Sequence, residues 1–386
     1  MNLPLSGITV VALEQAVAAP FASRQLADLG ATVIKIERPG GGDFARSYDK
    51  TVAGMSSHFV WLNRNKKSVT LDLKTTDGVE ALRSLIASAD VFIQNLAPGA
   101  IDRLGISAKQ LRAENPALIT CSISGFGEGG PMAGRKAYDL LIQAEVGLVS
   151  ITGSEDAPAK AGISIADIAA GMYAYSGVLA ALYERKSTGE GRELSVSLID
   201  ALAEWMGFPY YYGRYGGESP RRHGAHHATI APYGPVQCRD GSAIIAVQNE
   251  REWESFCRTV LEVAELAKDP RFSSVSQRVH NRAELDAIIH EHLQHTSIRE
   301  MITRLETAKI AYGSMNDVAS LDTHPQMTAR GRVQRISTPA GPVNSFIPVV
   351  TTDGWEPRLE QVPGEGAHTT QILASPVPAA AAATIP

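Results

Sequence analysis

One carboxylate stands apart from the other acids of this sequence. Residues 161–177 read AGISIADIAAGMYAYSG, and Asp167 is the only charged residue among them. A carboxylate in small, apolar surroundings can act as a nucleophile that attacks an activated acyl carbon and forms a covalent acyl intermediate. Main-chain amides nearby would then stabilise the oxyanion that develops. The alternative is a helix N-cap, in which the Asp side chain accepts N–H groups of the following turn. The pattern alone favours the cap.

Two stretches carry basic side chains that could hold an anion. Residues 35–46 place Arg38 directly after a predicted strand and end in Arg46, and arginine suits bidentate recognition of phosphate or carboxylate. Residues 218–228, ESPRRHGAHHA, include Arg222 and His226. A metal site is not expected there, because the adjacent histidines His226 and His227 would point in opposite directions on a strand. A pocket for an organic anion and a solvated loop both remain open for these stretches.

A glycine pattern in residues 124–131, SGFGEGGP, invites comparison with dinucleotide-binding loops. Such a loop opens a helix whose first turn holds the pyrophosphate. Here Pro131 and the residues MAGRK follow, so no helix begins at the required place. A nicotinamide-dependent oxidoreductase is therefore a weak alternative, and the segment is predicted to be a flexible loop.

The composition is that of a globular protein with room for two domains. The chain has 386 residues, 44% hydrophobic and 20% charged, with a formal net charge of -5. That charge gives no reason to expect nucleic acid or an anionic membrane as a partner. Three widely spaced cysteines predict neither a disulfide scaffold nor a thiolate zinc site. We find no signal peptide and no 18-residue membrane span, so the expected location is the cytoplasm.

Short apolar segments alternate with amphipathic ones through the first half of the chain. Strands are predicted at 8–13, 32–37, 68–73, 90–95 and 117–124, and helices at 21–30, 77–89, 138–150 and 167–186. This alternation predicts an α/β fold with a parallel sheet and helices on both of its faces. Ligand-binding groups gather at the carboxyl ends of such strands, and Glu37, Arg38, Asn95 and Ser124 all lie there.

The domain boundary is predicted in the Gly- and Pro-rich residues 213–235. A large domain would span 1–212 and a small domain 213–320, with a strand at 242–247 and helices to about 309. Residues 321–386 would return to the large domain, beginning with a turn and short helix at 321–331. Their last dozen residues are low in complexity and are predicted to be disordered.

Nine blocks of the sequence recur in order in one known family. They are PLSGITVV, LADLGATVIKIERPGGGD, NRNKKSVTLDLKTTDG, DVFIQNLAPGAIDRLG, ISGFGEGGP, KAYDLLIQAEVG, DIAAGMYAYSGVLAALYER, TGEGRELSVSLIDA and APYGPVQCRDG. Over about residues 3–350 the chain resembles the family III CoA-transferases, the group of formyl-CoA, carnitine and bile-acid CoA-transferases. The resemblance implies a Rossmann-like large domain, a smaller α+β domain and an interlocked homodimer.

The resemblance also implies which residues do the work. Asp167 matches the aspartate that carries the acyl group. The positions that match CoA contacts are Val17, Ala18, Arg38, Leu71 to Lys74, Asn95 to Ala97, Arg103 and Lys136 to Tyr138. In the implied reaction Asp167 attacks an acyl-CoA, an aspartyl-CoA thioester forms, and CoA passes to an incoming acid. No metal or redox cofactor is needed, because the CoA thioester is itself the substrate.

Details of the sequence narrow the expected substrate. Formyl-CoA transferases have glutamine where this chain has Val17, and their tetraglycine loop is missing here, which argues against oxalate and formate. The blocks around residues 14–30 and 136–147 look most like members that use succinyl-CoA with itaconate, mesaconate, citramalate or malate. Arg46, Arg222 or His226 would hold the distal carboxylate.

Two alternatives share the fold. The related α-methylacyl-CoA racemases use a histidine and an aspartate as acid and base, and Tyr138 stands at the histidine position. Tyrosine is a poor proton-transfer partner near neutral pH, so this activity ranks second. A non-catalytic CoA-binding protein, in which Asp167 only caps a helix, is the other alternative.

Overall fold

The computed structural model describes residues 3–374, and the tail predicted to be disordered lies almost entirely outside that range. The described chain forms two compact units. Unit 1 contains the described residues up to Val146, Gly162–Gly207 and the described residues from His324 onward. Unit 2 contains Gly147–Ala161 and Phe208–Thr323. Each unit has its own hydrophobic core.

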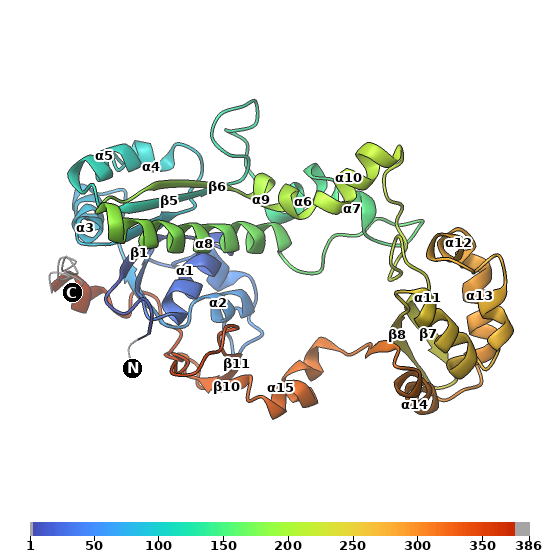
Figure 1. Ribbon diagram of the computed structural model, residues 1–386. Coiled ribbons are helices and arrows are strands. Elements are labelled where there is room, and N and C mark those ends of the chain that lie inside the picture. The colour runs from blue at the N-terminus through green and yellow to red at the C-terminus, as the bar shows by residue number, and fades with distance from the viewer. Residues whose placement is uncertain (1–2, 375–386) are drawn as a thin grey trace. The chain divides into compact units, whose positions relative to one another are not determined.

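Unit 1 is built on a six-stranded sheet, as the alternating pattern predicts (Figure 1). Its strands are β1 (Thr9–Leu13), β2 (Thr32–Glu37), β3 (Lys66–Thr70), β4 (Val91–Gln94), β5 (Ile119–Ser124) and β6 (Glu193–Ser197). The order is β3-β2-β1-β4-β5-β6, and every neighbouring pair is parallel. The order reverses between β1 and β4, so the loops that follow these two strands flank the topological switch point, where open α/β sheets bind ligands.

Apart from the short helix at 325–329, the helices of unit 1 are α1 (Ala18–Asp28), α2 (Ser57–Leu62), α3 (Thr76–Ala87), α4 (Ala100–Arg103), α5 (Ala108–Glu114), α6 (Asp139–Glu145), α8 (Ile165–Thr188), α9 (Leu198–Trp205) and α16 (Thr369–Ala374). Of these, α1, α3 and α8 lie close to the helices predicted at 21–30, 77–89 and 167–186. The single helix predicted at 138–150 is wrong. Gly147 adopts a left-handed conformation with φ 82° and separates α6 from α7 (Leu148–Ile151), because glycine enters this region without a steric penalty.

The two faces of the sheet differ in polarity. Side chains alternate between faces along a strand. Ile34, Ile36 and Val69 enter an apolar core with α3 and α5. Lys35 and Lys66 point to the opposite face, on which α1 and α8 lie (Figure 1). Both lysines are buried there, so the alternation places charge inside unit 1.

Helix α8 packs closely on α1 because a glycine stands at the crossing. A Cβ on Gly171 would lie 2.7 Å from the main-chain oxygen of Ala18 and 3.1 Å from Cβ of Phe21. Helix α8 also has the length and mean hydropathy, 1.4, of a membrane span, although 44% of the apolar window is buried. The helix itself was expected at 167–186, but the expectation that no 18-residue segment could span a membrane is corrected by its length and composition. One such helix is weak evidence for a membrane, since core helices meet the same criterion.

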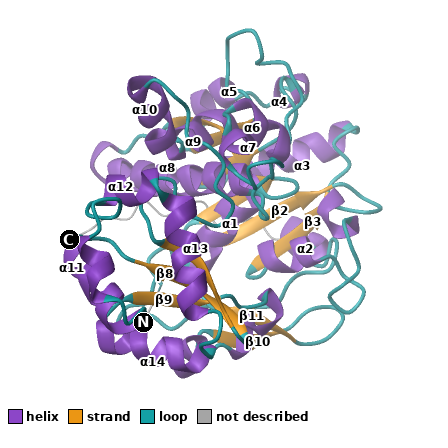
Figure 2. Ribbon diagram, turned by 90° about the vertical axis from the view of Figure 1, so that its right-hand side faces the viewer, coloured by secondary structure: helices purple, strands orange, loops and turns teal. Residues whose placement is uncertain are grey.

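Unit 2 combines an antiparallel sheet with helices (Figure 2). Its elements are α10 (Gly207–Gly216, which begins at the boundary), β7 (Tyr233–Cys238), β8 (Gly241–Ala246), α11 (Glu250–Ser255), α12 (Val275–His280), α13 (Arg282–Leu293), α14 (Ile298–Ala308) and β9 (Ala311–Ser314). The strands pair in the order β7-β8-β9. The core of unit 2 includes Trp253, Phe256 and Phe272.

The C-terminal segment closes one edge of the unit 1 sheet. It contains α15 (Pro325–Ala329) and the hairpin of β10 (Val333–Ile336) and β11 (Val343–Phe346). His368 donates its amide to Ser68 of β3 and accepts the Ser68 amide on Nδ1, at 3.0 and 3.2 Å. Thr369 accepts the Thr70 amide at 3.0 Å. These bonds occupy main-chain groups that an edge strand otherwise exposes.

Candidate active site

Asp167 lies in the first turn of α8 rather than at its cap. The helix begins at Ile165, and its N-cap residue is Ser164, whose side chain makes no capping hydrogen bond. Asp167 is therefore the third helical residue, which corrects the N-cap expected from the sequence pattern. An acid in this turn faces the positive end of the helix dipole. Its carboxylate does not cap the helix and can therefore interact with other groups.

The missing cap comes from another helix. Asp139, the first residue of α6, accepts the Ala166 amide on Oδ1 at 2.8 Å, and the Asp167 amide lies 3.5 Å from the same oxygen. Its other oxygen accepts the Gln143 side-chain amide at 2.6 Å. Sequence reasoning missed Asp139. The acid directly after Tyr138 in KAYDLL was the available signal.

The surroundings of Asp167 disfavour its charged form. Burial raises the pKa of its carboxyl from 3.8 to about 7, and the negative charge of Asp139 adds to the effect. Within residues 3–374, no lysine or arginine forms an ion pair with Asp167. A carboxylate without a cationic partner keeps its basicity and hence its nucleophilic strength.

The start of helix α1 presents main-chain amides beside α8. The N-cap residue Val17 provides no side-chain cap, and Val17, Ala18 and Ala19 are all buried. Their three amides have no acceptor within the described chain. Ile168, the neighbour of Asp167, packs against the cluster of Val17, Phe21 and Leu62, and Ala18 meets Gly171 one turn later. Buried unpaired amides are rare and suit a negatively charged oxygen.

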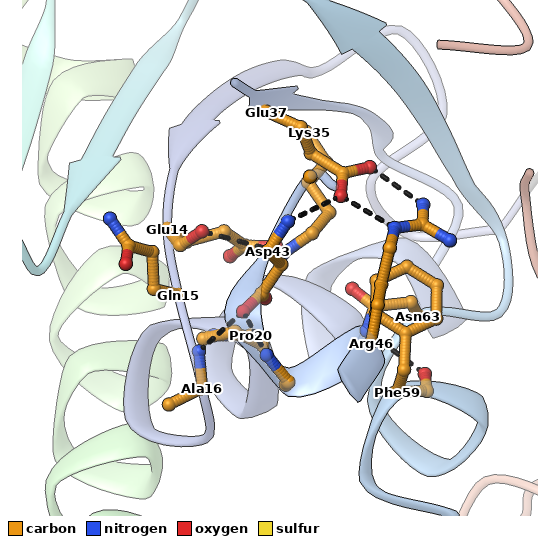
Figure 3. Close-up of polar contacts among 12 residues, drawn as sticks. Glu14, Gln15, Ala16, Pro20, Lys35, Glu37, Asp43, Arg46, Phe59 and Asn63 are labelled. Carbon is orange, nitrogen blue, oxygen red and sulfur yellow. Dashed lines mark hydrogen bonds and ion pairs between the residues drawn. The ribbon is translucent and has the colours of Figure 1, made fainter. Parts of the chain in front are cut away.

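A cluster of buried charges supports the turn before α1 (Figure 3). Lys35 donates to Asp43 at 2.9 Å and contacts Glu14 at 3.3 Å, and Lys66 donates to Glu14 at 2.7 Å. Burial opposes the ionised form of Glu14, but the charges of Lys66 and Lys35 outweigh it and lower its pKa. Burial lowers the pKa of Lys66 to about 8, an effect that Glu14 partly offsets.

The residues expected to contact CoA all follow the carboxyl ends of the strands of the unit 1 sheet. Each lies after the carboxyl end of a parallel strand: Val17 and Ala18 after β1, Arg38 after β2, Leu71 and Lys74 after β3, Asn95, Ala97 and Arg103 after β4, and Lys136 and Tyr138 after β5. Arg38, Lys74, Arg103, Lys136 and Tyr138 are exposed, whereas the Leu71 side chain is buried in the core.

A cavity opens beside some of these residues. It measures about 450 Å³ and lies between the loops that follow β4 and β5. Ala97, Gly99, Gly127 and Glu128 are among the residues that line it, and Asp167 is not. A cavity of this size suits part of a large ligand whose reactive end lies elsewhere.

Comparison with known proteins decides the family. The model of CoA-transferase family III matches residues 5–369. The chain belongs to CoA-transferase family III. Succinate–glutarate CoA-transferase of Agrobacterium fabrum is 34% identical over 96% of this chain and 95% of its own. Succinyl-CoA:mesaconate CoA-transferase of Haloarcula marismortui is 30% identical over 96% of this chain and 95% of its own. The crystal structure of a CAIB/BAIF family protein from Brucella suis has a TM-score of 0.86 and 35% identity, and covers 97% of this chain and 99% of that one.

Arg46 of this family III CoA-transferase is fully engaged. It pairs with Glu37 through Nε and Nη2, at 2.8 and 2.7 Å, and donates to the Pro363 carbonyl at 3.3 Å. Its guanidinium stacks on Phe59 at 3.6 Å from the ring centre. Arg46 therefore ties the C-terminal segment to the sheet, and a substrate carboxylate would have to displace these partners.

The other two candidates for the distal carboxylate lie in unit 2. Arg222 donates to the carbonyl oxygens of Ser150, Ser154 and Glu155, at 3.3, 2.9 and 2.8 Å. These bonds attach it to the loop at 147–161. His226 lies against Gly234 and near Asp286, whose pKa burial raises. Of the two, the His226 ring is the one not occupied by main-chain carbonyls.

Proposed function

We propose that this enzyme transfers CoA from succinyl-CoA to a small dicarboxylic acid through covalent intermediates on Asp167. The observation that carries the proposal is an aspartate without a cationic partner, whose pKa is raised to about 7, beside the unpaired amides of Val17 to Ala19. The relatives named above act with succinate or succinyl-CoA and with glutarate or mesaconate, which supports this donor and this class of acceptor.

The reaction would begin with the ionised Asp167. One carboxylate oxygen attacks the thioester carbon, the C–S bond breaks, and a mixed anhydride and a CoA thiolate form. The thiolate then attacks the Asp167 carbonyl carbon and releases succinate, which leaves an aspartyl-CoA thioester. Amides at the start of α1 would stabilise the oxyanion of each tetrahedral intermediate.

The acceptor half follows in reverse order. A carboxylate of the incoming dicarboxylic acid attacks the aspartyl-CoA carbon and expels the CoA thiolate, which gives a second anhydride. The thiolate attacks the acyl carbon that came from the acceptor, and the new CoA thioester leaves. Asp167 is restored as a carboxylate, with no net change in protons. Water must be excluded while an anhydride exists.

The pantetheine arm would reach Asp167 along the carboxyl edge of the sheet. We propose that the cavity beside Ala97 takes part of the CoA nucleotide, and that exposed Arg38, Arg103 and Lys136 bind its phosphates.

An interlocked homodimer belongs to the same proposal. It is supported by residues 311–331, nearly all of them exposed although they include Val318 and Leu321. Light scattering that gives twice the 41.2 kDa chain mass would support it, and a monomer would contradict it.

Trapping the intermediate tests the mechanism. The enzyme is incubated with succinyl-CoA and hydroxylamine, digested and analysed by mass spectrometry. A hydroxamate on Asp167 supports the proposal, and Asp167→Asn is the matched control. An unmodified Asp167, together with deuterium exchange at the α-carbon of a branched acyl-CoA, would support the racemase instead.

Product analysis tests the acceptor. Glutarate, mesaconate, citramalate, itaconate, malate and oxalate are offered separately with succinyl-CoA. A dicarboxylate of four or five carbons is expected to receive CoA, and transfer only to oxalate would contradict the proposal.

The variants Arg222→Ala and His226→Ala then test which of the two residues binds the distal carboxylate of the acceptor. The His226 change is expected to raise the acceptor KM more than the donor KM, and Arg46→Lys serves as a comparison at the other candidate position.

A further inference from the structure

Three consecutive residues of the β1–α1 turn are held by side chains from elsewhere in unit 1. Lys35 Nζ lies 3.5 Å from the Glu14 carbonyl oxygen. The Asn95 side chain accepts the Gln15 amide at 2.9 Å and donates to the Gln15 carbonyl at 2.8 Å. Asp43 accepts the Ala16 amide at 3.1 Å. These holding groups come from β2 and from the loops after β2 and β4.

The turn needs this support because its backbone is strained. Ala16 has φ 61°, in the left-handed region that a residue with a Cβ populates roughly tenfold less than glycine does. A non-glycine residue keeps such a conformation only where its surroundings determine it. Here the residue before Ala16 is bound on both main-chain polar groups, and Ala16 itself is bound by Asp43.

The two holding groups are themselves fixed. Asp43 is buried, accepts Lys35 Nζ at 2.9 Å and the Ala45 amide at 2.9 Å, and donates its own amide to Glu37. The Asn95 amide lies 3.4 Å from the Leu13 carbonyl, so this residue bridges β4 and β1 at the switch point. In Figure 3 the Gln15 side chain points away from Asp43 and from the charge cluster.

We infer that Asn95 and Asp43 are positioning residues that hold the left-handed Ala16, and through it the amides of Val17 to Ala19, against Asp167. The side chain of Asn95 therefore acts on the protein's own turn, whereas the sequence resemblance made Asn95 a contact of CoA. The inference rests on the proposed role of Asp167. It predicts a loss in kcat, because a misplaced turn changes the alignment of the reacting groups.

A rescue experiment distinguishes this role from a direct contact. Asn95→Ala is expected to lower kcat about tenfold or more, with a smaller change in the donor KM. Adding Ala16→Gly removes the Cβ penalty of the left-handed turn, so the double variant is expected to regain several-fold of the lost kcat. Asn281→Ala, which removes hydrogen bonds to main-chain carbonyls in unit 2, is the control.

Two further measurements keep the outcome clear. Asn95→Asp retains the acceptor for the Gln15 amide and loses the donor, so it replaces Asn95→Ala if that variant does not fold. Hydrogen exchange over residues 14–21 is expected to quicken in the Asn95 variants and not elsewhere in unit 1, whatever the substrate proves to be. Unchanged exchange, a loss confined to the donor KM, or no rescue by Ala16→Gly would overturn the inference. Failure of the wild-type enzyme to form an Asp167 adduct would instead overturn the proposed function.

Discussion

Two carboxylates of unit 1, the buried Glu37 and the half-buried Asp167, have pKa values that their surroundings shift in opposite directions. Burial raises the pKa of Glu37, but the hydrogen bond from Arg46 and the charge of Lys35 outweigh it, and the pKa falls to about 2. Burial also raises the pKa of Asp167, the negative charge of another acid, Asp139, adds to the effect, and the pKa rises to about 7.

The difference shows that burial alone does not decide what a carboxylate does. Glu37 binds Arg46 through two bonds and Ser68 through a third, so its oxygens have no freedom to attack a substrate. Asp167 has no such partner, and the start of α1, with the unpaired amides of Val17 to Ala19, lies beside its helix. Of these two carboxylates, the paired Glu37 stabilises the fold, and the proposed nucleophile Asp167 is the one without a cationic partner.

Asp167→Asn should produce the largest effect. The substitution keeps the shape and removes the nucleophile, so transfer is expected to fall by about 10³-fold or more. CoA binding, measured by calorimetry, should change little. Residual activity near the wild-type level would end the nucleophile assignment.

At high pH the same variant should be more stable than the wild-type protein. The folded chain holds the Asp167 proton up to about pH 7, whereas an unfolded carboxyl releases it near 3.8. The folded state thus binds more protons across this window, and stability falls as the pH rises through it. Asp167→Asn is expected to raise the melting temperature at pH 8 and to leave it almost unchanged at pH 4. A lower melting temperature at pH 8 would contradict this account.

Glu14→Gln makes the same chemical change in the paired environment and should act on stability. It leaves Lys35 and Lys66 buried without their shared acid, at an expected cost of about 3–5 kcal/mol. Urea unfolding measures the loss. An equally stable variant would show that the lysines find other partners or lose their protons.

Gly171→Ala tests how closely α8 must approach α1. The new Cβ would meet the Ala18 carbonyl at 2.7 Å, so the helices must move apart, at an expected cost of about 1–3 kcal/mol. Because the contact lies one turn from Asp167, kcat should fall as well. Gly177→Ala, where the nearest atom is 3.6 Å away, is the matched control on the same helix.

Asp139→Asn should have the smallest effect and the most specific one. The variant keeps an oxygen for the Ala166 amide and removes the charge that helps to raise the Asp167 pKa. The donor kcat/KM of the wild type is expected to rise with pH up to about 7. In the variant the profile should move to lower pH by roughly half a unit to one unit. A profile that does not move would assign the raised pKa to burial alone.

The sheet could be predicted from sequence because its information is local. Each of the five strands predicted in the first half of the chain begins within two residues of its expected start. Short apolar runs that alternate with amphipathic helices are typical of the buried strands of a parallel sheet. The break at Gly147 was missed because the residues on both sides of it keep a helical pattern. The resemblance to the family also singled out Arg38, Arg103 and Lys136, and the structure places these exposed side chains after β2, β4 and β5.

The support for the site was out of reach because it joins residues that are distant in sequence. Asn95 meets Gln15 across 80 residues, and Asp139 caps a helix that begins 26 residues later. A charged residue such as Arg46 has the same appearance in the sequence whether it binds a substrate or an internal acid. Only the fold shows that Glu37 and Pro363 occupy its donors.

The C-terminal bonds to β3 have a consequence for the order in which the chain is made. Ser68 and Thr70 find their partners about 300 residues later, in His368 and Thr369. While the chain leaves the ribosome, these groups on the edge of β3 have no partner until residues 368 and 369 have been made, and all of unit 2 is made before them. The nascent sheet is therefore a surface that chaperones or another strand can engage. Unit 1 gains this part of its structure only after unit 2 has been made.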